Sequence, residues 1–238
     1  MKPLGARGDE ALMTLFQKIA ARDEATVIRA LTAAPALATA TLQEGASRAQ
    51  AQAFFLDDIK RHVYAGDTAL HLAAAVYLNQ LARALLARGA QARAKNRRGA
   101  EPLHYAADGI PGSPWWGPEA QAATVATLLR AGADPNAADE SGVTPLHRAV
   151  RTRCGPAVAA LLAHGADAHR RNRGGSTPLH LAVLDTGRSG AGAAEAREQQ
   201  AGIIRALLAH GARASDRDTQ GKSVREAANA DWIRALLR

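Results

Sequence analysis

Residues 142–147 read Gly-Val-Thr-Pro-Leu-His, and three further segments of the chain closely match them. These segments read GDTALH, GAEPLH and GSTPLH and begin at residues 66, 99 and 175. A second motif, two leucines followed by a Gly-Ala pair, begins at residues 85, 128, 161 and 207. The distance from Gly132 to Thr144, and again from Gly165 to Thr177, is 12 residues. Two motifs in a fixed register predict a repeated structural unit.

The residue types in the two motifs predict a pair of helices in each unit. Thr144 suits a helix N-cap, where its hydroxyl accepts a hydrogen bond from a backbone N–H. Pro145 follows at the first helical position, where a missing N–H costs nothing. Gly132 suits the left-handed residue that ends the second helix. Each unit therefore reads as a hairpin loop, a short helix, a turn and a longer helix.

The repeat resembles the ankyrin repeat, whose 33-residue period and Thr-Pro-Leu-His signature it matches over residues 66–238 and more weakly over 9–40. This resemblance implies an all-α solenoid of stacked helix-turn-helix units with β-hairpin-type finger loops. Strings at residues 96–99 and 148–154 also resemble those of a group of bacterial ankyrin proteins. We expect an N-terminal cap with an inserted helical segment over residues 1–65 and a C-terminal capping repeat over 221–238. The four repeats expected between them are 66–98, 99–141, 142–174 and 175–220.

Insertions lengthen two of the units beyond the 33-residue period, by 10 and 13 residues. The extra residues fall between the two helices of their units, at 108–118 and 185–195. A neutral insertion is the simplest interpretation of both, because a longer surface loop costs little stability. We expect Trp115 and Trp116 to fold back over the helices as a lid, the alternative being a binding anchor.

A third insertion of 22 residues precedes the first full unit. Its apolar side chains, which include Phe54, Phe55, Leu56 and Ile59, predict a short helix over residues 46–61 that packs on the first units. We interpret this segment as structural.

Histidine is placed regularly rather than clustered. His71, His104, His147 and His180 each end a copy of the first motif. The resemblance implies that they form hydrogen bonds to loop backbone between neighbouring repeats. The sequence contains no paired-cysteine or His-Glu-x-x-His motif, so we expect no metal.

Cys154 is the single cysteine, and it leaves two interpretations open. The adjacent Arg151 and Arg153 would lower a thiol pKa and make the residue redox-sensitive or, in an enzyme, nucleophilic. A small buried apolar residue is the simpler interpretation. Because the sequence suggests no partnered base or paired carboxylates, we expect no catalysis and no cofactor.

The chain is basic, with 30 Lys and Arg against 22 Asp and Glu, a net charge of +8 and a pI of about 10.3. Such a surplus attracts acidic proteins or anionic polymers. Basic and acidic residues alternate between successive loops, as at Arg93 and Asp134, so neighbouring loops are also expected to pair. No run of about 18 apolar residues and no signal-like N-terminus is visible, which predicts a cytoplasmic protein that does not cross a membrane.

The resemblance implies that a partner docks on the concave surface, which consists of the finger loops and the outer face of the first helices. We predict a monomeric, non-catalytic scaffold for protein–protein interaction that binds an acidic partner protein. Nucleic acid or another polyanion is the alternative, although aromatic residues are too few for an evident stacking platform. Tyr105 is expected to be a central aromatic contact. The other candidate contacts are Arg97, Arg98, Glu140, Arg148, Arg151, Arg173, Trp115 and Trp116.

Overall fold

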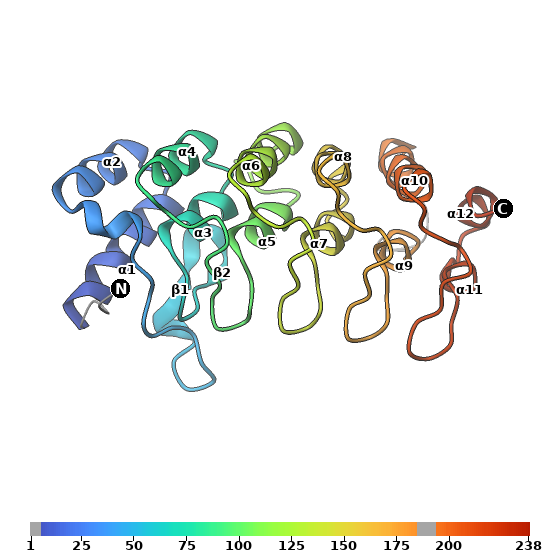
Figure 1. Cartoon of the computed structure of the whole chain (residues 1–238), viewed down its shortest axis with the longest axis horizontal. Coiled ribbons are helices and arrows are strands. Elements are labelled where there is room, and N and C mark those ends of the chain that lie inside the picture. The colour runs from blue at the N-terminus through green and yellow to red at the C-terminus, as the bar shows by residue number, and fades with distance from the viewer. Residues whose placement is uncertain (1–5, 185–193) are drawn as a thin grey trace.

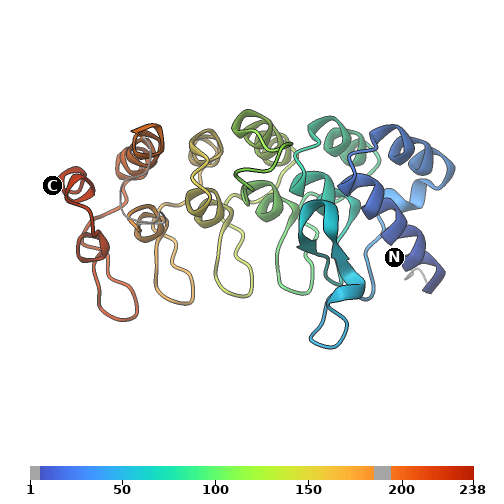
Figure 2. The ribbon, with the colours of Figure 1, turned by 180° about the vertical axis from the view of Figure 1, so that it is seen from behind.

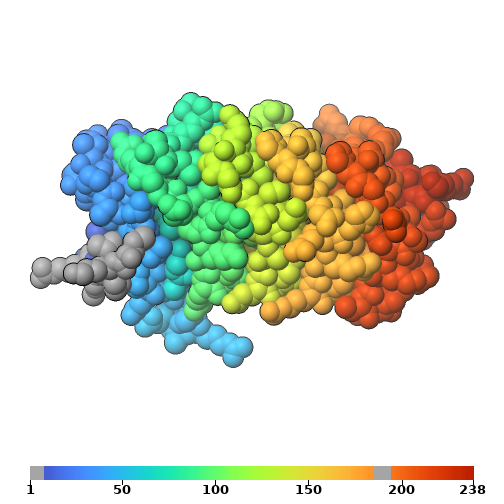
Figure 3. Space-filling view, viewed as in Figure 1, coloured from blue at the N-terminus to red at the C-terminus, as the bar shows by residue number. Residues whose placement is uncertain are grey.

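A computed structural model describes residues 6–184 and 194–238 of the chain. Helix pairs stack in single file from the N-terminus to the C-terminus, and their finger loops all extend to the same side (Figure 1). Seen from behind, the second helices form one row and the first helices another row next to the fingers (Figure 2). The space-filling view shows the units as successive bands along the solenoid (Figure 3). The fold is the all-α solenoid expected from the repeated motifs.

The N-terminal pair is α1 (Ala6–Ala20) and α2 (Glu24–Ala33), followed by the 3₁₀ turn η1 (Pro35–Ala38). Leu12, Phe16 and Ile19 of α1 are buried against the first full unit and complete the core at this end. The later helix pairs are α3 (Ala69–Ala75) with α4 (Asn79–Ala87), α5 (Pro102–Ala107) with α6 (Pro118–Arg130), α7 (Pro145–Arg151) with α8 (Gly155–Ala163), α9 (Pro178–Ala182) with α10 (Ala194–Ala209), and α11 (Val224–Ala227) with α12 (Asp231–Leu236).

The helix ends have the chemistry that the motifs predict. The backbone N–H of His147 donates to the Thr144 hydroxyl, and the backbone N–H of Thr144 donates to Nδ1 of His147 at 3.2 Å. Gly132 has φ +87°, the left-handed conformation that ends α6. Leu103, Leu146 and Leu179 are fully buried, so the motif leucines form the core between units.

The motif histidines connect each unit to the next. Because Nδ1 accepts a hydrogen bond, Nε2 carries the proton and donates to a backbone carbonyl of the following unit. His104 reaches Val143 O at 3.1 Å, and His147 reaches Ser176 O at 3.0 Å. Burial lowers the pKa of the His104 ring to about 4 and also lowers the pKa of the His147 ring, which keeps both rings neutral. These contacts agree with the role that the resemblance implied for the histidines.

The prediction of a short helix over residues 46–61 is wrong. This segment forms the 3₁₀ turns η2 (Gln52–Phe54) and η3 (Asp57–Ile59) and the antiparallel strands β1 (Phe55–Leu56) and β2 (Arg61–His62). Lys60 adopts a left-handed conformation with φ 48°, which turns the chain back, and the rings of Phe55 and His62 lie 4.8 Å apart across the pair. Leu56 and Ile59 are buried in the core of the solenoid and hold this hairpin against the helices.

The tryptophans of the first unit insertion fold back onto the helices, as expected. Both side chains are half-buried and pack against the core. The ring of Trp115 lies 5.9 Å from that of Tyr77, and Trp116 Nε1 donates to Gln121 Oε1 at 2.8 Å. Most of the second unit insertion, residues 185–193, lies outside the described part of the chain. In that described part, no helix is long and apolar enough to cross a membrane.

Candidate functional site

A hollow of about 520 Å³ opens on the concave surface between the β1–β2 hairpin, the fingers of units 99–141 and 142–174, and helices α5 and α7. We call it the cationic hollow. Its lining carries five cationic side chains and two acidic ones, which gives a formal charge of +3 with His62 neutral. The cations are Lys60, Arg61, Arg98, Arg148 and Arg151, and the acids are Asp108 and Asp139.

Asp108, which follows α5, lies among three arginines. Its carboxylate accepts a hydrogen bond from Arg151 Nη2 at 2.8 Å, from Arg61 Nη2 at 3.3 Å and from Arg148 Nη1 at 3.4 Å. Burial acts to raise the pKa of Asp108, but the three guanidinium groups outweigh it and hold that pKa below its usual value. The side chain is 17% exposed, so this charge cluster is partly removed from water.

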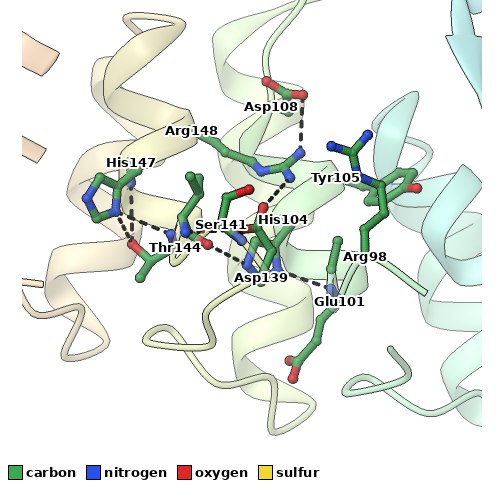
Figure 4. Close-up of polar contacts among 12 residues, drawn as sticks. Arg98, Glu101, His104, Tyr105, Asp108, Asp139, Ser141, Thr144, His147 and Arg148 are labelled. Atoms are coloured by element: carbon green, nitrogen blue, oxygen red, sulfur yellow. Dashed lines mark hydrogen bonds and ion pairs between the residues drawn. The ribbon is translucent and has the colours of Figure 1, made fainter. Parts of the chain in front are cut away.

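Arg148 connects Asp108 to the next finger (Figure 4). Its Nη2 donates to Asp139 Oδ2 at 2.9 Å, and Asp139 in turn accepts from the backbone N–H groups of Ser141 and Val143. The Arg148 side chain is only 16% exposed, and its Nε is buried without a hydrogen-bond partner among the described residues. Arg148 therefore organises the floor of the hollow instead of projecting freely from the surface.

Tyr105 does not present an aromatic surface as we expected, because its side chain is 2% exposed. Its hydroxyl donates to the Asp67 carboxylate at 2.9 Å and accepts from Asn96 Nδ2 at 3.0 Å. Arg61 lies over the ring, with Cζ 5.0 Å from the centroid. The hydroxyl points into a polar network between units, and Tyr105 also lines the cationic hollow.

Arg97 and Arg98 occupy the tip of the finger between α4 and α5 and are exposed. Their guanidinium groups lie 5.4 and 5.1 Å from the centre of the Tyr64 ring. Arg98 also donates to the Tyr64 hydroxyl at 3.0 Å, and Arg97 donates to the carbonyl of Ala46. Both cations are thus held beside the inserted segment.

The later finger tips also expose the predicted residues. Glu140 and Arg173 are exposed, and their backbone N–H groups donate to Arg98 O and Ser141 O of the preceding finger, each at 2.9 Å. Neighbouring loops pair as expected where Arg93 Nη2 lies 3.0 Å from Asp134 Oδ2. Such an exposed pair is worth about 0–1 kcal/mol. The fingers are therefore ordered mainly by backbone hydrogen bonds.

Arg61 is the contact that the sequence did not reveal. It lies in a segment predicted to be helical and structural, and its partner Asp108 is 47 residues away. Asp108 and the arginines at 148–153 were visible in the sequence, but the bonds that Arg148 and Arg151 make to Asp108 were not. Trp115 and Trp116 lie outside the lining of the cationic hollow.

Cys154 has the environment of a structural residue. It is 1% exposed, and burial raises the pKa of its thiol to about 11. A thiol in that environment is a weak nucleophile near neutral pH. In residues 6–184 and 194–238, no group of three or more His, Cys, Asp or Glu side chains is placed to hold a metal ion.

Comparison with known protein families identifies the repeats. The family model described as "Ankyrin repeat" matches residues 65–97 and again 98–140. The model described as "Ankyrin repeats (many copies)" matches residues 128–182. A search of curated proteins gave no match.

Proposed function

Because the chain is an ankyrin repeat protein, we propose that it is a non-catalytic interaction module that binds an acidic partner protein through its concave surface. The observation that carries this proposal is the cationic hollow at the centre of that surface. Ankyrin repeats are generally protein-interaction modules, and the cations of the hollow indicate which kind of partner suits this one. Long-range attraction between the cations and an acidic surface would speed the encounter and align the two proteins.

The different positions of the motif residues, which are buried, and of several arginines, which are exposed, support this proposal. The motif leucines and histidines are buried between units, so the fold accounts for them. The exposed cations Arg98, Arg151 and Arg173 lie along the fingers and first helices, where the fold does not require arginine. Exposed charge that the helix pairs do not need for their packing is available for recognition.

Nucleic acid binding is the second candidate, and the cationic lining favours it in the same way. Single-stranded nucleic acid also needs open aromatic faces on which bases stack. In this structure arginines lie over the rings of Tyr64 and Tyr105. An acidic protein therefore fits this surface better than single-stranded nucleic acid does.

A charge-reversal experiment tests the proposed function. Proteins that co-purify with the chain are identified by mass spectrometry, and the affinity of the most enriched one is measured with Arg98→Glu/Arg173→Glu. We expect a loss of at least about tenfold, the range seen when charged interface residues are reversed. Arg88→Glu/Arg130→Glu changes the net charge equally on the second helices and serves as the matched control. Equal binding by both variants would contradict the use of the concave surface.

DNA provides the test of the second candidate. The affinities of the chain for single-stranded and duplex oligonucleotides are measured across a salt titration. Binding that is as tight as that of the protein partner and weakens steeply with salt would favour nucleic acid instead.

A further inference from the structure

Resting on the proposed function, we propose that the cationic hollow binds glutamate or aspartate side chains of an extended acidic segment in the partner. We further infer that Asp108 is a built-in competitor that occupies the same arginines and limits the affinity. The juxtaposition that carries this inference is one carboxylate shared by Arg61, Arg148 and Arg151.

The arginines around Asp108 retain hydrogen-bonding capacity. A guanidinium group has five N–H donors, whereas Arg61 and Arg151 each make one hydrogen bond to Asp108 among the described residues. Arg148 is divided between Asp108 and Asp139 and is the most fully engaged of the three. A second carboxylate in the hollow therefore finds donors that Asp108 does not use.

The charge balance of the hollow points the same way. Its +3 formal charge persists although Asp108 and Asp139 are already included. Arg61 and Arg148 are each less than one-fifth exposed, so water screens their charge less than it screens the charge of an exposed side chain. An added carboxylate is stabilised more strongly here than on the exposed rim.

The shape of the hollow indicates an extended segment. A volume of about 520 Å³ accommodates a few side chains and is too small for a folded element. The β1–β2 hairpin forms one wall and supplies Lys60 and Arg61, while the fingers form the opposite side. We identify carboxylate as the ligand group because the cluster already holds the carboxylate of Asp108 in this way.

Asp108 weakens binding in this arrangement because an incoming carboxylate meets a like charge and shares its donors. Asp108→Asn removes that charge and keeps a carbonyl oxygen to which one arginine donates. We expect this variant to bind an acidic peptide about tenfold more tightly than the natural chain. Arg61→Glu is expected to weaken the same binding by at least about tenfold, because it removes a donor and adds a like charge.

The test is fluorescence anisotropy with a short labelled peptide of alternating Glu and Gly, at fixed low salt. A peptide with Gln for Glu, a phosphoserine peptide and single-stranded DNA are the comparison ligands. Arg130→Glu is the matched charge control for Arg61→Glu, and circular dichroism melts establish that each variant is folded. Tighter binding by Asp108→Asn, weaker binding by Arg61→Glu and little change with Arg130→Glu would support the proposal.

Other outcomes overturn it in distinguishable ways. Unchanged or weaker binding by folded Asp108→Asn would remove Asp108 as a competitor. Equal weakening by Arg61→Glu and Arg130→Glu, or tighter binding of the phosphoserine peptide or of DNA, would remove the hollow as a carboxylate site. Suppose that the peptide does not bind while binding of the co-purified partner is still weakened by Arg98→Glu/Arg173→Glu. In that case the proposed function stands and this inference falls.

Discussion

Units 99–141 and 142–174 share one arrangement of helices and motif residues, which we call the frame. The first unit departs from this frame at two places. In both units, the motif histidine accepts from its own unit and donates to the next, through His104 to Val143 O and His147 to Ser176 O. The first unit has Glu101 where the second has Thr144, and it carries 10 additional residues between its helices. Asp108 lies at the start of that insertion. The frame thus tolerates a changed cap and a longer turn, and the start of the longer turn, with Asp108, lines the cationic hollow.

Glu101 is the less obvious departure. Its side chain is 0% exposed, and its carboxylate oxygens are buried without a hydrogen bond among the described residues. Arg93 Nε and Lys95 Nζ each lie 4.0 Å from Oε1. Burial raises the pKa of Glu101 despite these two cations. Unit 99–141 therefore buries the carboxyl group of Glu101 at the position where unit 142–174 has the helix-capping hydroxyl of Thr144.

The largest expected effect comes from truncating the core leucines, which tests whether the two units contribute equally to the unfolding free energy. Leu103→Ala and Leu146→Ala each remove a fully buried side chain between units, and each should cost about 2–5 kcal/mol of unfolding free energy. Urea denaturation followed by circular dichroism measures both losses. Since the second unit lacks the insertion, a much smaller loss for Leu103→Ala would mean that the longer unit packs more loosely than its neighbour.

Acid should destabilise both units through their histidines. The pKa of His104 is lowered to about 4 by burial, and burial also lowers the pKa of His147. A histidine whose pKa is lower in the folded state than in the unfolded state, where it is about 6.5, contributes its full stability at a pH above 6.5. This stability is lost as the pH falls from 6.5 toward 4. For His104 alone the loss is on the order of 3 kcal/mol.

Unfolding free energies measured at several pH values between 7 and 4 check this expectation. Gln at either position preserves an N–H donor for the neighbouring carbonyl and does not titrate. His104→Gln should therefore flatten the pH dependence more than a conservative surface change such as His164→Gln. An unchanged slope with His104→Gln would place the acid sensitivity elsewhere.

The frame was predictable because its determinants are local. The cap at Thr144, the proline that follows it and the left-handed Gly132 act within a few residues of one another, so their spacing alone indicates the helix ends. The family resemblance added the hydrogen bonds of the histidines between units. Sequence reasoning was accurate for the repeated motifs, where neighbouring residues decide the helix ends.

The cationic hollow was only partly predictable because its contacts are distant in sequence. Arg61 and Arg151 lie 47 and 43 residues from Asp108, and the hairpin that supplies Arg61 was expected to be a helix. Tyr105 occupies the same motif position as Arg148, yet it turns inward because Asp67 and Asn96 of the preceding unit accept and donate to its hydroxyl. Which way such a side chain points depends on its neighbouring unit.

Exchanging the caps tests what makes Glu101 tolerable. Thr144→Glu places a buried carboxylate in unit 142–174, where the positions equivalent to Arg93 and Lys95 are Asn136 and Ala138. We expect a loss of about 2–3 kcal/mol, because the new charge is buried without the two cations that face Glu101 and the threonine cap is lost. Denaturation at pH 7 measures it, with Thr144→Ser as the control that keeps a hydroxyl. A loss as small as that of Thr144→Ser would mean that nearby cations are not needed.

The reciprocal change, Glu101→Thr, has the smallest expected effect and the opposite sign. It restores a capping hydroxyl and removes a buried carboxylate, and we expect about 1 kcal/mol of added stability at pH 7. Because the folded pKa of Glu101 is raised, its protonated form contributes stability below the ordinary value of 4.5, and this is lost as the pH rises through the raised value. The gain from Glu101→Thr should therefore shrink as the pH is lowered toward 4.5. A gain that is constant with pH would assign the benefit to the cap alone, and a loss would mean that Arg93 and Lys95 more than offset the burial of the carboxylate.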